Sequence, residues 1–184
     1  MRVGHIVRTC YYPRSLPEMI ARVMRAIDYN SIRWALERSV SSDVTLKRMW
    51  QMEFYKAAYR STPNTVVTSA DVGALFGTSG FINFTVHANN SSFFWGIEIL
   101  RYVDRLEEHI GRFTTGGRYT LLALTDFYLI DFGRIDKISL EKIATDMDLY
   151  EKLFVVTFDT TLENVVVLNS KMEDIFKIES SRQP

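Results

Sequence analysis

The chain has 184 residues, with 22 Lys and Arg against 22 Asp and Glu, and 47% of its residues are hydrophobic. This length and composition are those of a folded domain with a core of its own, and they exclude a disordered chain. No apolar run approaches the ~20 residues of a membrane span. We expect an intracellular protein without a signal peptide, because the N-terminus lacks an apolar segment. The single cysteine, Cys10, fits a reducing compartment.

Charge is unevenly distributed along the chain although the net charge is zero. Residues 1–60 contain 11 Lys and Arg against 5 Asp and Glu. A basic N-terminal third suits contact with phosphate groups. Solvated helix faces explain it equally well, since the Arg residues are scattered among apolar ones.

Two helices are predicted before residue 43, after a short lead-in where His5–Val7 suits an edge strand. Pro17 fits the first turn of the first helix, which leaves its N–H groups unbonded in any case. The apolar residues that follow recur with helical spacing: Ile20, Val23, Met24 and Ile27. A second, shorter helix begins at about Ser31 and carries Trp34.

A longer helix is predicted from Asp43 to about Tyr59. Its core-facing positions repeat with helical period: Leu46, Trp50, Phe54 and Ala57. Glu53 falls on or beside the same face, because it lies seven residues after Leu46. The helix therefore carries a carboxylate in apolar surroundings. A strand follows from Thr65 and continues irregularly to Val72.

The segments 80–87 and 93–100 predict two antiparallel strands joined by a turn of Asn and Ser residues. If the chain folds back about Asn90 and Ser91, Asn83 lies directly opposite Glu98. Strand alternation then places Asn83 and Glu98 on one face of the sheet. A carboxylate inside an apolar strand needs a partner. A structural pairing of Glu98 with Asn83 or an arginine carries as much weight as a functional role.

The second half of the chain predicts one more helix and several strands. Asp104 is a suitable N-cap for a helix over 105–113, with His109 beside its apolar stripe; such a histidine is more often a core-edge residue than a functional one. The remaining predictions are strands over 119–124 and 127–132, a charged helical or irregular segment over 134–150, a hairpin of strands 153–158 and 165–168, and a short helix after residue 170. The fold class is therefore α/β, a mixed β-sheet flanked by helices, in one compact domain.

The order helix, strand, strand, strand, helix, strand resembles the core of the restriction-endonuclease-like, PD-(D/E)xK nuclease superfamily. Several short sequence segments are similar to the nuclease-like domain of Crinkler-type (Crinkler–RHS-type) effector proteins. Five segments carry this resemblance in order: Trp50–Ala57, Phe76–Phe84, Trp95–Arg101, Glu108–Phe113 and Gly116–Tyr119. It covers residues 43–170, which leaves residues 1–42 as an N-terminal helical decoration and 171–184 as a tail.

The resemblance implies acidic residues on the second and third strands that bind Mg²⁺, which activates water against a phosphodiester. Glu98 stands at the third-strand acid, and Glu53 at the acid that the first helix sometimes supplies. Asn83 stands where the motif has Asp, and Leu100 where the superfamily often has Lys. Arg101 follows, but alternation turns it to the other face.

The resemblance thus implies metal ligands and catalytic residues on three elements. The implied metal ligands are Glu53, Asn83 and Glu98, and the implied catalytic set adds Arg101 and His109. Mg²⁺ would bind weakly with an amide at position 83, and Asn83→Asp is expected to raise Mg²⁺-dependent cleavage.

Three functions follow as hypotheses. The first is a metal-dependent nuclease acting on DNA, weakened by Asn83, and the second is a non-catalytic nuclease-fold domain that binds DNA or a host protein. The third is a structural domain whose Glu53 and Glu98 are paired inside. The resemblance implies action in a host nucleus. The lack of a long apolar run predicts no membrane partner.

Overall fold

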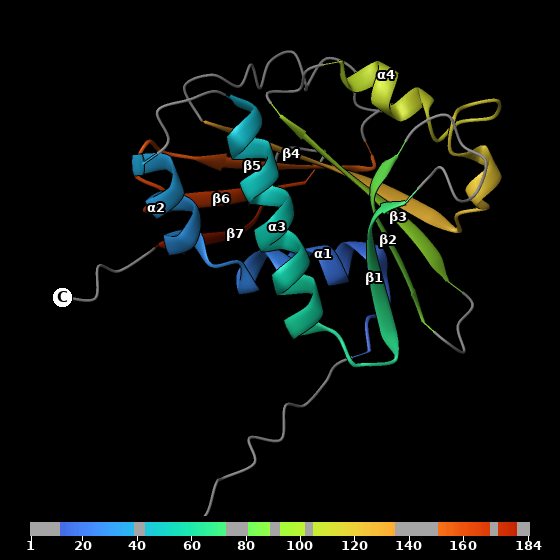
Figure 1. Cartoon of the computed structure of the whole chain (residues 1–184), viewed down its shortest axis with the longest axis horizontal. Coiled ribbons are helices and arrows are strands. Elements are labelled where there is room, and N and C mark those ends of the chain that lie inside the picture. The colour runs from blue at the N-terminus through green and yellow to red at the C-terminus, as the bar shows by residue number, and fades with distance from the viewer. Residues whose placement is uncertain are drawn as a thin grey trace, which may run out of the picture.

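Seven strands of the described residues form one mixed sheet in the computed structural model (Figure 1). The structure describes residues 12–38, 43–72, 81–88, 93–101, 105–134, 151–169 and 173–179, apart from the side chains of 43–46, 134 and 178–179. The strands are β1 (Val66–Val72), β2 (Ile82–Ala88), β3 (Phe94–Arg101), β4 (Asp126–Arg134), β5 (Leu153–Phe158), β6 (Asn164–Leu168) and β7 (Asp174–Glu179). The helices are α1 (Leu16–Ala26), α2 (Tyr29–Arg38), α3 (Asp43–Ser61) and α4 (Leu106–Gly111), with a 3₁₀ turn, η2, at Thr120–Leu122.

The strands follow one another across the sheet in chain order. Neighbours pair antiparallel from β1 to β3 and again from β5 to β7, whereas β3, β4 and β5 run parallel. The predicted mixed sheet with flanking helices is confirmed. Parallel strands in the middle of a sheet are covered on both faces. Accordingly, all of β5 and residues 95–100 of β3 are buried.

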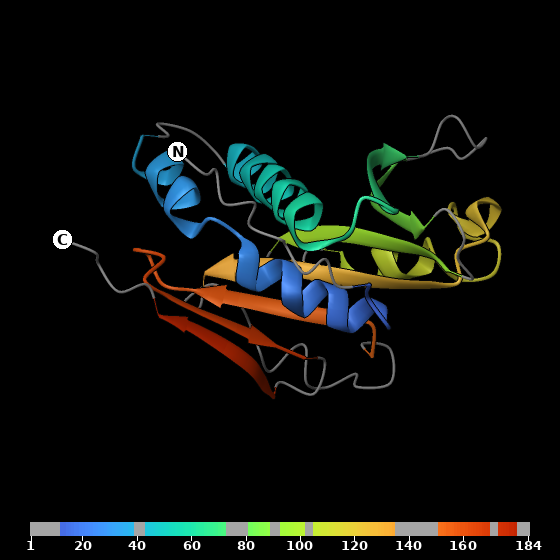
Figure 2. The ribbon, with the colours of Figure 1, turned by 90° about the horizontal axis from the view of Figure 1, so that it is seen from below.

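The helices cover the two faces of the sheet separately. Side chains of α1 and α3 share one apolar cluster with Ile97, Ile99 and Phe132. Leu106 and Ile110 of α4 belong to a second cluster, on the opposite face. Figures 1 and 2 show α1, α2 and α3 grouped on one side of the sheet, with α4 apart from them.

The predicted N-terminal helices form where the sequence places them. Ser15 caps α1 by accepting a hydrogen bond from the Glu18 N–H at 3.4 Å, and Pro17 lies in the first turn. The four predicted apolar positions, three in α1 and the fourth, Ile27, directly after it, are all buried. In α3, Trp50, Phe54 and Ala57 are buried as the helical period requires.

The register of the hairpin between β2 and β3 is also as predicted. Phe84 pairs with Ile97 and Thr85 with Gly96, the register that sets Asn83 opposite Glu98. The hairpin of β5 and β6 is antiparallel, as expected.

Side-chain alternation nevertheless breaks at Asn83. Ile82 packs with Tyr119 beside α4, whereas Phe84 packs against Phe54 of α3. Two residues of one strand that are two apart normally share a face. The neighbouring strand is irregular at the same level, since Asp71 has a left-handed φ of 51°. Asn83 and Glu98 are therefore opposite in register but do not share their surroundings.

Two predicted elements are wrong. The strand expected over 119–124 is replaced by the η2 turn, because the buried Tyr119 is held by a hydrogen bond from its hydroxyl to the Phe81 carbonyl at 2.8 Å. The helix expected after residue 170 is strand β7, which extends the sheet beyond the predicted core. Its alternation of Phe176, Lys177 and Ile178 has the period of a strand.

Three predictions lie outside the described residues. They concern the edge strand at His5–Val7, the N-cap Asp104 and the segment 135–150.

Candidate functional site

Glu98 is the centre of a buried polar cluster between β3 and α4. Its side chain is 3% exposed, and its Oε1 atom accepts a hydrogen bond from Arg112 at 2.6 Å. The Nδ1 atom of His109 lies 3.0 Å from the same oxygen. The Tyr119 hydroxyl donates to it at 3.4 Å. The structure therefore brings together the predicted Glu98 and His109, with Arg112 and Tyr119 beside them.

Local structure explains why α4 delivers these side chains to Glu98. Leu106 and Ile110 anchor the short helix in the apolar cluster, which turns His109 toward the sheet. Behind the helix, Gly117 lies so close to the backbone carbonyls of Gly111 and Arg112 that no Cβ atom would fit. The Tyr119 N–H then donates to the Arg112 carbonyl at 2.8 Å. This close turn fixes Arg112 and Tyr119 next to each other.

The charges in the cluster shift the pKa values of its members. Burial alone would lower the pKa of Arg112, but the hydrogen bond to Glu108 and the Glu98 charge outweigh it and raise that pKa. Burial, followed by the Glu98 charge, raises the pKa of Tyr119 to about 12. Both groups are thereby kept as hydrogen-bond donors to Glu98 at neutral pH.

Lys47 of α3 lies within electrostatic range of the cluster. Burial lowers the pKa of Lys47; Glu98 opposes this shift, and Arg112 and Arg105 reinforce it. Sequence reasoning missed this residue, although the signal was present. Lys47 precedes Trp50 by three residues and Phe54 by seven, which is the spacing of the core-facing stripe.

Asn83 lies in a different environment. Its Oδ1 atom accepts a hydrogen bond from the Ile99 N–H at 2.7 Å. Its side chain lines a pocket between α3 and the first two strands, together with Arg48 and Tyr55. The amide oxygen that the resemblance offers to a metal is thus already engaged by the backbone of β3.

Glu53 is buried on a third side of the molecule. It is 1% exposed and accepts a hydrogen bond from Lys56, one turn along α3, at 2.7 Å. It lines a hollow between α2 and α3 with Ser31 and Trp34. Glu53 and Glu98 thus bond to different partners, Lys56 of α3 and Arg112 after α4.

Two further charged residues lie on the central strands, Arg101 on β3 and Asp131 on β4. Arg101 ends β3 beside Phe132, which places it on the face opposite Glu98, as alternation predicts. Asp131 of β4 is fully buried and pairs in register with Leu100, on the Glu98 face. Sequence reasoning overlooked Asp131, which is a carboxylate inside an apolar strand just as Glu98 is.

The three side chains assigned to Mg²⁺ do not form one oxygen-lined site. Mg²⁺ requires several oxygen ligands arranged octahedrally around one point. Glu53, Asn83 and Glu98 have separate partners, and one oxygen of Glu98 already faces three cationic or donor groups. Among the described residues, no group of three or more His, Cys, Asp and Glu side chains is placed to hold a metal ion. Mg²⁺ binding stays a prediction that these side-chain positions do not fit.

In comparisons with known proteins, no family model and no curated sequence matches this chain. The fold defines a mixed α/β protein, and its described helices include none that is long and apolar enough to cross a membrane. The observed order α3, β1, β2, β3, α4, β4 is the order that the nuclease resemblance implies. The resemblance itself rests on the five sequence segments.

Proposed function

We propose that this chain is a nuclease-fold domain that binds DNA without cleaving it. The observation that carries the proposal is the state of Glu98, whose Oε1 atom is 2.6 Å from Arg112 and 3.0 Å from His109. A carboxylate neutralised by an arginine at this distance is a poor ligand for a divalent cation, because the guanidinium already occupies the position of the positive charge. This favours the binding hypothesis over the nuclease hypothesis.

Support for DNA as the partner comes from cations on two elements. α3 supplies Lys47 and Arg48, and the α4 region supplies Arg105 and Arg112; Lys47 interacts electrostatically with both arginines near α4. Arg48 and Arg105 are exposed, at 64% and 63%, and their ion pairs are long, at 3.4 and 3.5 Å. Exposed pairs of this kind contribute little to stability. Both arginines can therefore exchange a carboxylate for a phosphate.

The test is the salt dependence of DNA binding, measured by fluorescence anisotropy with a short labelled duplex. We expect binding in the presence of EDTA that weakens as salt rises. The double variant Arg48→Ala, Arg105→Ala should bind more weakly and lose about 0.9 from the slope for each phosphate contact removed. Lys177→Ala is the matched control, since Lys177 is also exposed, at 59%, but lies on β7 at the opposite edge of the sheet from β1.

Two results would overturn the proposal. Equal losses in the control and in the arginine variant would show that binding is not directed to the surface of α3 and α4. No measurable affinity for the duplex would leave the host-protein hypothesis as the better one.

A further inference from the structure

α3 exposes apolar side chains on the side that does not face the core. Met52, Tyr55 and Tyr59 are 47%, 42% and 72% exposed. They recur at helical spacing on one stripe, next to the stripe of Trp50 and Phe54 that is fully buried. A helix that only covers a sheet carries polar residues on its outer face. Neighbouring exposed apolar side chains are a feature of binding sites.

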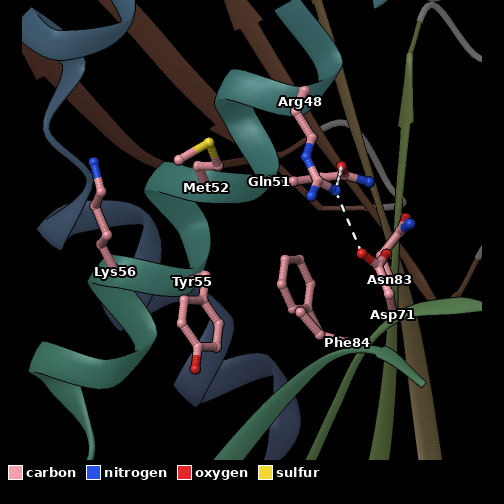
Figure 3. A pocket seen from close by; sticks show the side chains of 9 residues that line it. Arg48, Gln51, Met52, Tyr55, Lys56, Asp71, Asn83 and Phe84 are labelled. Atoms are coloured by element: carbon pink, nitrogen blue, oxygen red, sulfur yellow. Dashed lines mark hydrogen bonds and ion pairs between the residues drawn. The ribbon is translucent and has the colours of Figure 1, made fainter.

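A pocket lies where this stripe meets strands β1 and β2 (Figure 3). Its volume is about 190 Å³. Pockets that hold drug-sized ligands measure roughly 300–1,000 Å³, so this one is large enough for a single ring system. The lining residues are Arg48, Gln51, Met52, Tyr55, Lys56, Ala70, Asp71, Asn83 and Phe84.

Two aromatic rings form part of the pocket wall. The rings of Tyr55 and Phe84 are nearly parallel, at 14°, with centroids 6.4 Å apart. Rings that stack directly in this protein are much closer, such as Phe93 and Trp95 at 3.8 Å. Tyr55 and Phe84 are therefore a widely offset pair, and Tyr55, which is 42% exposed, still offers ring area to another planar group.

Four polar side chains, Arg48, Gln51, Asp71 and Asn83, gather at one end of the pocket, whereas Lys56 lies on the other side (Figure 3). Arg48 contacts Gln51 and Asp71 at 3.4 Å each, which are long and weak interactions. Asn83 uses its Oδ1 atom for the Ile99 N–H, so its Nδ2 group remains as the donor on the pocket side. A ligand thus meets an aromatic wall, amide groups and the exposed Arg48 beside Asp71; the second exposed cation of the lining, Lys56, is bonded to Glu53.

We propose that this pocket binds a nucleobase that carries a phosphate. A planar base stacks on Tyr55, and its polar edge hydrogen-bonds to Gln51 and Asn83. The phosphate binds Arg48 and replaces the long contacts of that guanidinium. Stacking of bases on aromatic side chains is sequence-tolerant, because every base has a π-face. An aliphatic or simple aromatic ligand would make no use of the amides or of the guanidinium, so the polar end of the pocket favours a ligand with polar and anionic groups.

The nucleotide has two sources, a free mononucleotide or an unpaired nucleotide of a single strand. In the second case the inference deepens the proposed function, because it adds a site for an exposed base to the cationic surface. The two proposals share Arg48 but differ in their other residues: Tyr55 belongs to the pocket alone, and Arg105 to the cationic surface alone.

The experiment measures the affinity of AMP, adenosine and ribose 5-phosphate by calorimetry, and that of a labelled single-stranded oligonucleotide by anisotropy. We expect AMP to bind more tightly than adenosine, and ribose 5-phosphate not to bind measurably. Tyr55→Ala should weaken AMP binding about 5- to 150-fold, the range that corresponds to the stacking of one base. Tyr59→Ala is the matched control, because Tyr59 lies one turn along the same exposed stripe but outside the pocket.

Tyr55→Phe should retain binding, and Tyr55→Leu should lose it while keeping the apolar volume, so the pair separates stacking from a general effect on folding. Equal affinities of the Tyr55→Leu and Tyr59→Ala variants for AMP would overturn the inference. Binding of AMP without binding of the oligonucleotide would identify a free nucleotide as the ligand. A third outcome is that the arginine variant loses duplex binding, while AMP does not bind and Tyr55→Ala has no effect on any affinity. This outcome would reject the pocket as a nucleotide site and keep the proposed function.

Discussion

Glu53 and Glu98 are both buried carboxylates, but they are held in different ways. Glu53 is paired with Lys56 of its own helix, and the side chain of that lysine is 54% exposed. Glu98 is paired with Arg112 and His109 of a separate element, whose side chains are 16% and 9% exposed. The first pair is local and reaches solvent, whereas the second joins β3 to α4 inside the protein.

This comparison teaches that burial of a carboxylate is a weak guide to its role. Removal of one partner from a buried ion pair leaves the other charge uncompensated, whereas a partner in solvent keeps its hydration. Glu98 should therefore be essential for the attachment of α4, and Glu53 should be replaceable. The following predictions test that difference.

The largest effect is expected for Glu98→Ala. The variant removes the buried carboxylate beside Arg112 and His109, although Arg112 keeps Glu108 at 2.7 Å. The free energy of unfolding should therefore fall by about 1.5–3 kcal/mol, the range for a hydrogen bond to a charged group. Urea denaturation measures this change. Glu98→Gln is the control for shape, and Gln should destabilise the protein less because its amide oxygen still accepts from Arg112. A loss below about 1 kcal/mol for Glu98→Ala would contradict the account, since exposed pairs give losses of that size.

A smaller effect is expected for Glu53→Leu. Lys56 remains solvated when its partner is removed, and leucine fills the hollow between α2 and α3 with apolar volume. The free energy of unfolding should change by less than about 1 kcal/mol or rise slightly. The same denaturation experiment compares this variant directly with Glu98→Leu. If the two leucine variants were equally destabilised, the distinction between the local pair and the tertiary cluster would fail.

The smallest effect is a titration shift at Lys47. Burial lowers the pKa of Lys47, while the Glu98 charge raises it. A lowered pKa means that the neutral, reactive amine is present at lower pH than in free lysine. The rate of Lys47 acetylation, followed by mass spectrometry as the pH is raised, should therefore reach half of its maximum at a lower pH than that of Nα-acetyl-lysine. Glu98→Gln should lower this midpoint further because it removes the opposing charge.

Glu53→Gln is the matched control for the titration and should leave the Lys47 midpoint where it is. A midpoint at or above that of free lysine would show that Lys47 does not lie in the buried cluster. A shift caused by Glu53→Gln would place Glu53 near Lys47 and so contradict the separation of the two carboxylates.

Local patterns predicted most of the fold. The apolar stripes of α1 and α3 have the helical period. A fold-back about Asn90 and Ser91 predicts the observed pairing of Phe84 with Ile97. The strand expected at 119–124 failed because the tertiary hydrogen bond of Tyr119 decides that segment. Strand β7 shows alternation in its own sequence, so its misassignment as a helix was avoidable.

The candidate site was predictable only in part. The apolar strand around Glu98 predicts a buried carboxylate that needs a partner. His109 was already a candidate catalytic residue. The identity of the partner depends on where α4 lies against the sheet, and no local pattern contains that information. The same limit explains the assignment of Glu53 and Asn83 to a shared site, since strand alternation breaks at Asn83 and Glu53 turns toward α2.

The most direct test of the central claim is cleavage of plasmid DNA by the unaltered chain and by Asn83→Asp, with Mg²⁺ or Mn²⁺. The account predicts no cleavage by either protein, because the Glu98 oxygen stays with Arg112 whichever residue stands at position 83. This differs from the expectation from sequence alone, in which Asn83→Asp raises the activity. Metal-dependent cleavage by Asn83→Asp that disappears when Glu98→Gln is added would contradict the account, since it would make Glu98 a metal ligand and the protein a nuclease.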